Sequence, residues 1–178
     1  MGKFEQKHSN KNLLIPVLLI ITAIAICVTV WALFFRDSSP VLAPDYAPKE
    51  EEQHAETIPD DNSEKMDQPD GGGSVSLTYA REVSIDLGER TATLYFANPG
   101  KSNQNVVLQI VVQDKVIVQS GTLKPGNQVV SLELLDGAEK MLSAGGYEGK
   151  FVVLYYHPET AEKAVVNTEI PVSITVNE

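Results

Sequence analysis

The sequence is poor in cysteine and in basic side chains, and both shortages exclude classes of protein. Only one of its 178 residues is a cysteine, Cys27, so no disulfide can form within the chain. The formal net charge is −10, from 14 basic and 24 acidic residues, and no segment concentrates the lysines and arginines that a nucleic-acid surface needs. We therefore expect neither a disulfide-stabilised secreted module nor a nucleic-acid-binding protein.

Patterns of catalytic and metal-binding residues are also scarce. The three histidines, at positions 8, 54 and 157, have no cysteine partner for a zinc site, because Cys27 lies in an apolar run. No G-x-S-x-G nucleophile motif occurs, and the acidic residues lack the spacing of a calcium-binding loop. His157 near Glu159 is a weak pair that we interpret as an ordinary loop histidine, and a Ser–His–Asp triad built on it stays an open alternative. We expect no cofactor, no metal and no enzymatic activity.

A long apolar run stands near the N-terminus instead. Residues 13–35, LLIPVLLIITAIAICVTVWALFF, contain no charged side chain. As a helix, 23 residues would reach about 35 Å, enough to cross a hydrocarbon core of about 30 Å. Three lysines precede the run and only Arg36 directly follows it, so the positive-inside rule places the N-terminus in the cytoplasm.

We interpret the run as an uncleaved signal anchor. It is longer than the core of a cleaved signal peptide, and no good cleavage site follows it. Residues 1–12 would then be a cytoplasmic tail and residues 13–35 would contact the lipid bilayer. We expect a single-pass protein of the cell membrane whose C-terminal domain is extracellular.

Residues 36–73 have the composition of a disordered acidic stalk. Eleven acidic side chains and only two lysines fall within residues 37–71, together with five prolines, and Gly71, Gly72 and Gly73 end the segment. Few apolar side chains are present to offset the entropy of ordering. Such a spacer could reach roughly 120 Å when fully extended.

From residue 74 to residue 178, apolar and polar residues alternate over short stretches that turn signals separate. Strands are predicted at 75–79, 83–87, 92–96, 106–112, 116–118, 129–135, 151–156 and 170–176, with one helical turn at 138–142. Seven to eight short strands favour an all-β domain, an immunoglobulin-like β-sandwich with a Greek key. Tyr147, just before a late strand, is expected to form a tyrosine corner by bonding back to the chain near Leu142.

The stretch FANPGKSNQN, residues 96–105, contains the triplet Gly100-Lys101-Ser102 that ends many phosphate-binding loops. The full signature needs a glycine where Tyr95 stands, and a helix where residues 106–112 read as a strand. We therefore exclude nucleotide and expect a loop at one tip of the sandwich. The candidate partner contacts are Asn98, Lys101, Asn103 and Tyr156, since Tyr155 and Tyr156 should face opposite sides of their strand.

Three stretches carry a resemblance: YFANPGKSNQNVVLQIVV, LKPGNQVVSLEL and LSAGGYEGKFVVLYY. Their succession of strand, Asn-x-Gly turn, strand and Gly-x-Tyr resembles bacterial cell-adhesion-related (CARDB-type) immunoglobulin-like domains over roughly residues 90–156. The whole layout is similar to that of membrane-anchored proteins of Gram-positive bacteria. The resemblance implies a surface module and brings no catalytic residues.

Two functions follow as hypotheses. The first is a membrane-anchored extracytoplasmic binding or scaffolding module, an accessory protein of a cell-envelope assembly whose partner is an envelope protein or wall polymer. The alternative is a carbohydrate- or cell-wall-binding β-sandwich, for which Tyr79, Tyr155 and Tyr156 are the candidate stacking residues.

Overall fold

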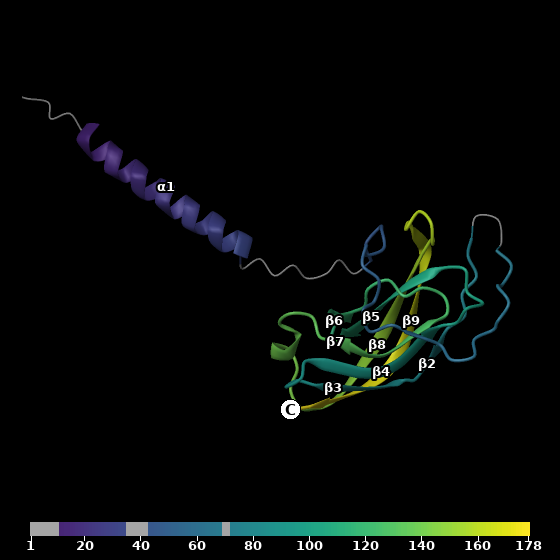
Figure 1. Ribbon diagram of the computed structural model, residues 1–178. Coiled ribbons are helices and arrows are strands. Elements are labelled where there is room, and N and C mark those ends of the chain that lie inside the picture. The colour runs from purple at the N-terminus through teal and green to yellow at the C-terminus, as the bar shows by residue number, and fades with distance from the viewer. Residues whose placement is uncertain (1–10, 35–42, 69–71) are drawn as a thin grey trace, which may run out of the picture. The chain divides into compact units, whose positions relative to one another are not determined.

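The computed structural model describes residues 11–34, 43–68 and 72–178 (Figure 1), and the chain divides into two compact units, residues 1–39 and 40–178. The first unit contains helix α1 (Lys11–Phe34), in which the hydroxyls of Thr22 and Thr29 donate to carbonyl oxygens four residues earlier, at 2.9 and 2.8 Å. Among the described residues, no helix meets the length and hydropathy of a membrane span. The predicted anchor stays a prediction. Residues 1–10 of the tail, residue 35 of the anchor, and residues 36–42 and 69–71 of the predicted stalk lie outside the described residues.

The second unit is mostly β-sheet, as the alternating sequence predicts. Within its described residues the elements are β1 (Glu56–Thr57), β2 (Thr78–Tyr79), β3 (Glu82–Asp86), β4 (Thr91–Asn98), β5 (Asn105–Val112), β6 (Lys115–Gln119), β7 (Asn127–Glu133), η1 (Ala138–Lys140), β8 (Gly145–Tyr156) and β9 (Lys163–Asn177). Each of the eight predicted strands overlaps an observed one, and the predicted helical turn is the 3₁₀ helix η1. Only β1 was not expected, because it lies in the predicted stalk.

These strands form one curled sheet in the order β1-β7-β4-β3-β9-β8-β5-β6, with β2 paired to β4. Strand β3 joins the two halves of the curl because it pairs antiparallel with β4 and parallel with β9. Strand β6 approaches the end of β7, because Val118 bridges Leu134 and the Leu135 N–H donates to the Ile117 carbonyl oxygen at 2.9 Å. The sheet therefore wraps almost completely around its contents (Figure 1).

The interior of the curl is the main hydrophobic core. Strand β9 shows why the sequence folds this way: its residues from Ile170 to Val176 are alternately buried and exposed, one face inside and one outside. Phe96 of β4 and Phe151 of β8 meet edge to face across the core, with ring centroids 6.1 Å apart. Both rings are fully buried, so they tie the two halves of the curl together.

The predicted tyrosine corner is confirmed. Tyr147 lies near the start of β8, and its hydroxyl donates to the Ser143 carbonyl oxygen at 3.1 Å while it accepts from the Ser143 N–H at 3.0 Å. The contact falls one residue from the expected position. It secures the chain between η1 and β8.

Residues 43–68 differ from the disordered stalk expected there, and we call this segment the strap. It lies on the sheet in extended form and donates and accepts hydrogen bonds along its length. The Thr122 hydroxyl donates to the Pro48 carbonyl oxygen at 2.8 Å, β1 pairs with β7, and the Met66 N–H donates to the Lys101 carbonyl oxygen at 2.8 Å. The strap belongs to the compact domain.

The strap is ordered because of the sheet beneath it and not because of its own composition. All eight residues of β5 and the last six of β8 are buried, so both faces of these strands are covered. Five of their residues form a second apolar cluster outside the main core, which the strap's Ala43 and Ala47 cover: Val107, Val111, Val152, Leu154 and Tyr156. The prediction of disorder rested on the charges of residues 43–68 alone and did not include the apolar surface of the sheet that binds them.

Candidate functional site

The loop that the sequence marks as a contact surface is partly covered by the chain itself. Asn98 is fully buried, and its side-chain N–H groups donate to the carbonyl oxygens of Gln104 and Leu123 at 3.0 and 3.2 Å. The Asn103 side-chain oxygen accepts a hydrogen bond from the Ser74 N–H at 2.7 Å. Lys101 is half-buried, and its backbone carbonyl oxygen accepts a hydrogen bond from the Met66 N–H. The expectation that Asn98 contacts a partner is therefore corrected, because its side chain is fully buried. Lys101 and Asn103 bond to the strap and to the segment after it but are only half-buried, so their contact with a partner stays a prediction.

The two adjacent tyrosines are also not a contact surface. Tyr155 packs in the main core and Tyr156 in the second cluster, so they do face opposite sides of β8, but the strap covers the outer side. The Tyr156 hydroxyl donates to the Pro44 carbonyl oxygen at 3.0 Å. Burial, together with the nearby Asp45 carboxylate, raises the pKa of Tyr156 to about 12.

The Gly100-Lys101-Ser102 triplet forms a tight turn whose polar groups bind other parts of the chain. The Gly100 N–H donates to the carboxylate of Asp61 in the strap. Hydrogen bonds from the Ser63 hydroxyl and then from the Gly100 N–H lower the pKa of Asp61. The Ser102 hydroxyl accepts from the Ser76 N–H at 2.9 Å and donates to the Ser76 carbonyl oxygen at 3.1 Å. A strand follows the turn, as predicted.

A groove of about 790 Å³ lies beside the hairpin that joins β8 and β9, and we call it the hairpin groove. Apolar side chains form part of its wall, among them Val75 and Tyr155, and Gln104, His157 and Lys163 add polar groups. Tyr155 reaches it from the core, with its hydroxyl 2.6 Å from that of Thr168. Burial raises the pKa of the Tyr155 phenol.

The rim of this groove carries two exposed valines that the sequence analysis did not single out. Tyr156 pairs with Lys163 and Leu154 with Asn167, so three residues of β9 bulge opposite Tyr155 alone. Val165 is 101% and Val166 65% exposed. Neighbouring residues of a regular strand face opposite sides, so the bulge is what turns both valines to solvent.

The polar groups beside the groove bond mainly within the hairpin itself. His157 accepts from the N–H groups of Glu159 and Thr160 on its Nδ1, both at 3.3 Å, so the histidine that the sequence left open caps its own turn. In the part of the chain that the structure describes, no three histidine, cysteine or carboxylate side chains gather as a metal site would require. What the groove and its rim offer is apolar surface, and the signal for it was the non-alternating Ala-Val-Val at 164–166.

No protein-family profile matches this chain, and no curated protein matches it. Among solved structures it is similar to the Escherichia coli chaperone DraB, at 11% identity and a TM-score of 0.39, over 59% of this chain. The chain spans only about half of that chaperone, 55% of its length. It is also similar to AggA, the major subunit of aggregative adherence fimbriae type I from Escherichia coli, at 10% identity and a TM-score of 0.32, over 63% of this chain and all of that one. Likenesses this remote carry no functional argument.

Proposed function

We propose that this protein is a single-pass, membrane-anchored binding or scaffolding module. It would present an immunoglobulin-like β-sandwich outside the cell and act as an accessory protein of a cell-envelope assembly. The CARDB-type resemblance over residues 90–156 belongs to the same proposal.

The pairing of the strands supports the immunoglobulin-like assignment. Strands β3, β4 and β7 form one half of the curl and β9, β8, β5 and β6 the other, with β3 shared between them. In immunoglobulin-like sandwiches, Greek-key connections link two such sheets and a tyrosine corner precedes a late strand. Tyr147 supplies that corner.

The observation that carries the functional proposal is the strap. Because the described part of the domain already includes residue 43, at most residues 36–42 separate it from the apolar run 13–35. That short link reaches at most about 30 Å, against roughly 120 Å for the whole of residues 36–73. A domain so placed suits an accessory role beside a membrane assembly and could not act as a long-range adhesin.

The alternative, a carbohydrate- or wall-binding module, gains no support from the tyrosines proposed for it. Tyr155 and Tyr156 are buried and Tyr79 is half-buried, so none offers an open ring face for sugar stacking.

The anchor and its orientation can be tested in cells with a membrane-impermeant thiol reagent. In a Cys27→Ala background, the reagent should label Thr175→Cys, on the exposed face of β9, and should leave Lys7→Cys unlabelled until the cells are lysed. Equal labelling of both sites in intact cells would contradict the orientation. Crosslinking of the same protein in intact cells should capture an envelope protein, and a variant lacking residues 13–35 should capture none.

A further inference from the structure

The chain enters its domain at the tip of the β8–β9 hairpin. The Lys163 N–H donates to the Asp45 carbonyl oxygen, and the Ala47 N–H donates to the Ala161 carbonyl oxygen, both at 2.9 Å. Between these bonds, Tyr46 bridges Glu162, and its side chain is 62% exposed. The first described residues of the strap are therefore fastened to the hairpin itself.

The exposed valines of the β9 bulge lie on the same hairpin, two and three residues beyond the bond at Lys163. Together with Tyr46 they make up what we call the hairpin patch: Tyr46, Val165 and Val166. Among the described residues of the domain, Val165 and Val166 are the most exposed large apolar side chains. Tyr46 is the only other one that is more than half exposed. Nothing within the described domain covers them.

We propose that the hairpin patch rests on the outer surface of the membrane in which this chain is anchored. The inference rests on the proposed function, because it needs residues 13–35 to span that membrane. The length of the linking chain selects this occupant: residues 36–42 reach at most about 30 Å and end beside the patch. Tyrosine is favoured at the membrane interface, since its ring prefers apolar surroundings and its hydroxyl prefers water.

The charges around the patch decide what kind of lipid it suits. Residues 45–47 and 157–166 carry three carboxylates, of Asp45, Glu159 and Glu162, and one ammonium group, of Lys163. This surplus of negative charge repels anionic headgroups, so the contact depends on apolar burial and favours a zwitterionic surface. Three side chains bind weakly by themselves, but the covalent link raises the effective concentration of the membrane enough for a weak contact to form.

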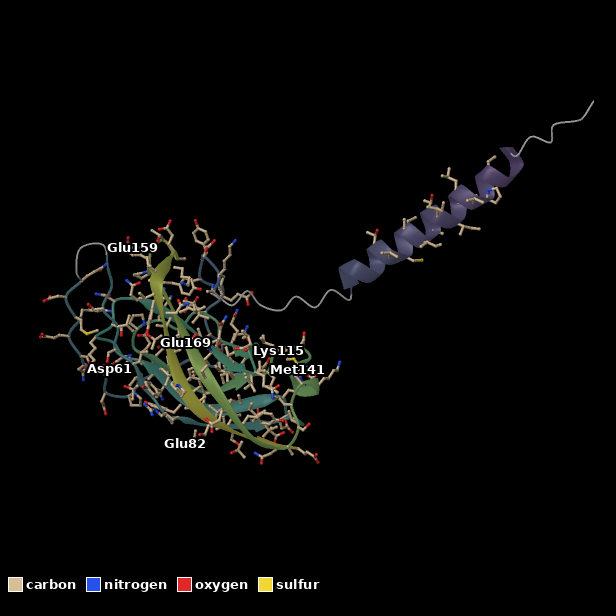
Figure 2. The ribbon with its side chains drawn as sticks, turned by 180° about the vertical axis from the view of Figure 1, so that it is seen from behind. Asp61, Glu82, Lys115, Met141, Glu159 and Glu169 are labelled. Atoms are coloured by element: carbon tan, nitrogen blue, oxygen red, sulfur yellow. The ribbon has the colours of Figure 1, made fainter. Side chains whose placement is uncertain are left out.

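The opposite end of the domain supplies a matched control. Figure 2 shows Glu159, at the hairpin turn, and Met141, after η1, at opposite ends of the domain. Met141 is 41% exposed and would face away from a membrane that the hairpin touches.

The test uses the full chain with Cys27→Ala, reconstituted in phosphatidylcholine vesicles. A fluorophore is attached at Asn167→Cys, which leaves the patch intact, or at Met141→Cys. A quencher carried on the lipid headgroup should quench the label at position 167 at least twofold more than the label at position 141. Replacing Val165 and Val166 with serine should remove most of that difference, and adding anionic lipid should reduce it.

Equal quenching at the two positions would overturn the proposal, as would a difference that survives the serine substitutions. Flotation of the same samples separates this failure from that of the anchor. Protein that floats with the vesicles and shows equal quenching is anchored without docking, whereas protein that does not float overturns the anchor itself and the docking with it.

Discussion

Strands β8 and β9 are neighbours in one sheet, yet the outer face of β8 is buried from Val152 to Tyr156 whereas that of β9 is exposed from Glu169 to Asn177. On β8 the outward residues Val152, Leu154 and Tyr156 are buried beneath or beside the strap. On β9 the outward residues from Glu169 to Asn177 are exposed, and Lys150 of β8 reaches Glu169 at 2.9 Å in solvent. The surface that the strap covers therefore ends between β8 and β9.

The difference shows what keeps the strap in place. Its own sequence is acidic and proline-rich, and it contributes only Ala43 and Ala47 to the second cluster. The sheet supplies the apolar surface, and hydrogen bonds fasten the strap at intervals. An acidic segment is ordered here because the strands beneath it are apolar on both faces.

The largest loss of stability is expected from a charge placed on the face that the strap covers. Val107→Asp places a charge in the fully buried second cluster and should lower the free energy of unfolding by about 3 kcal/mol or more. Thr175→Asp, on the open face of β9, should change it by less than about 0.5 kcal/mol. Urea unfolding of both proteins measures the contrast, and a mild effect at position 107 would mean that the strap does not cover this face in solution.

The strap's fastening can be tested at two adjacent carboxylates. The Glu52 side chain is only 7% exposed and accepts from the N–H groups of Gly121, at 2.7 Å, and His54, at 2.9 Å. Glu52→Ala leaves these donors without their partner and should cost about 1–3 kcal/mol. Glu51, 63% exposed beside Lys124, is the control, and Glu51→Ala should cost at most about 1 kcal/mol. Equal losses would contradict the importance of Glu52.

Alkaline pH should loosen the covered region selectively. Tyr156 has its pKa raised to about 12, so the folded state favours the neutral phenol. This stability is fully present below pH 10, the ordinary pKa of tyrosine, and is lost as the pH rises through 12. The urea midpoint of the wild type should therefore fall between pH 10 and pH 12. Tyr156→Phe should lose the hydrogen bond to Pro44, about 1 kcal/mol, and show a shallower fall. An unchanged slope would mean that the hydroxyl is not buried.

The smallest effect is expected at the far end of the strap. The pKa of Asp61 is lowered from 3.8, so its bonds to Ser63 and Gly100 contribute above about pH 4 and are lost as the pH falls through the lower folded value. The amide resonance of Gly100 should follow this titration by NMR in the wild type, and should not titrate in Asp61→Asn. A Gly100 resonance that is independent of pH in both proteins would contradict the contact.

Much of the fold was predictable from local patterns. The alternation in β3 and β9 predicted one-sided burial, and the turn signals placed most strand ends within a few residues. The starts of β8 and β9 are the exceptions, since they lie six and seven residues before the predicted ones. Tyr147 was predictable because its corner bonds to a residue only four positions away. The strap and the candidate site were not, since composition does not reveal contacts such as that of Tyr156 with Pro44, 112 residues apart. The continuous apolar runs of β5 and β8 were the available signal that a cover was needed.

The sequence by itself determined the strands, their inward faces and the position of the apolar run, because each depends on side-chain pattern within a few residues. Only the tertiary structure decided that Asn98 and Tyr156 are buried, that residues 43–68 form a strap, and that the bulge exposes Val165 and Val166. These outcomes depend on which distant surfaces meet when the sheet curls, and the free energy of covering an apolar face belongs to both partners together.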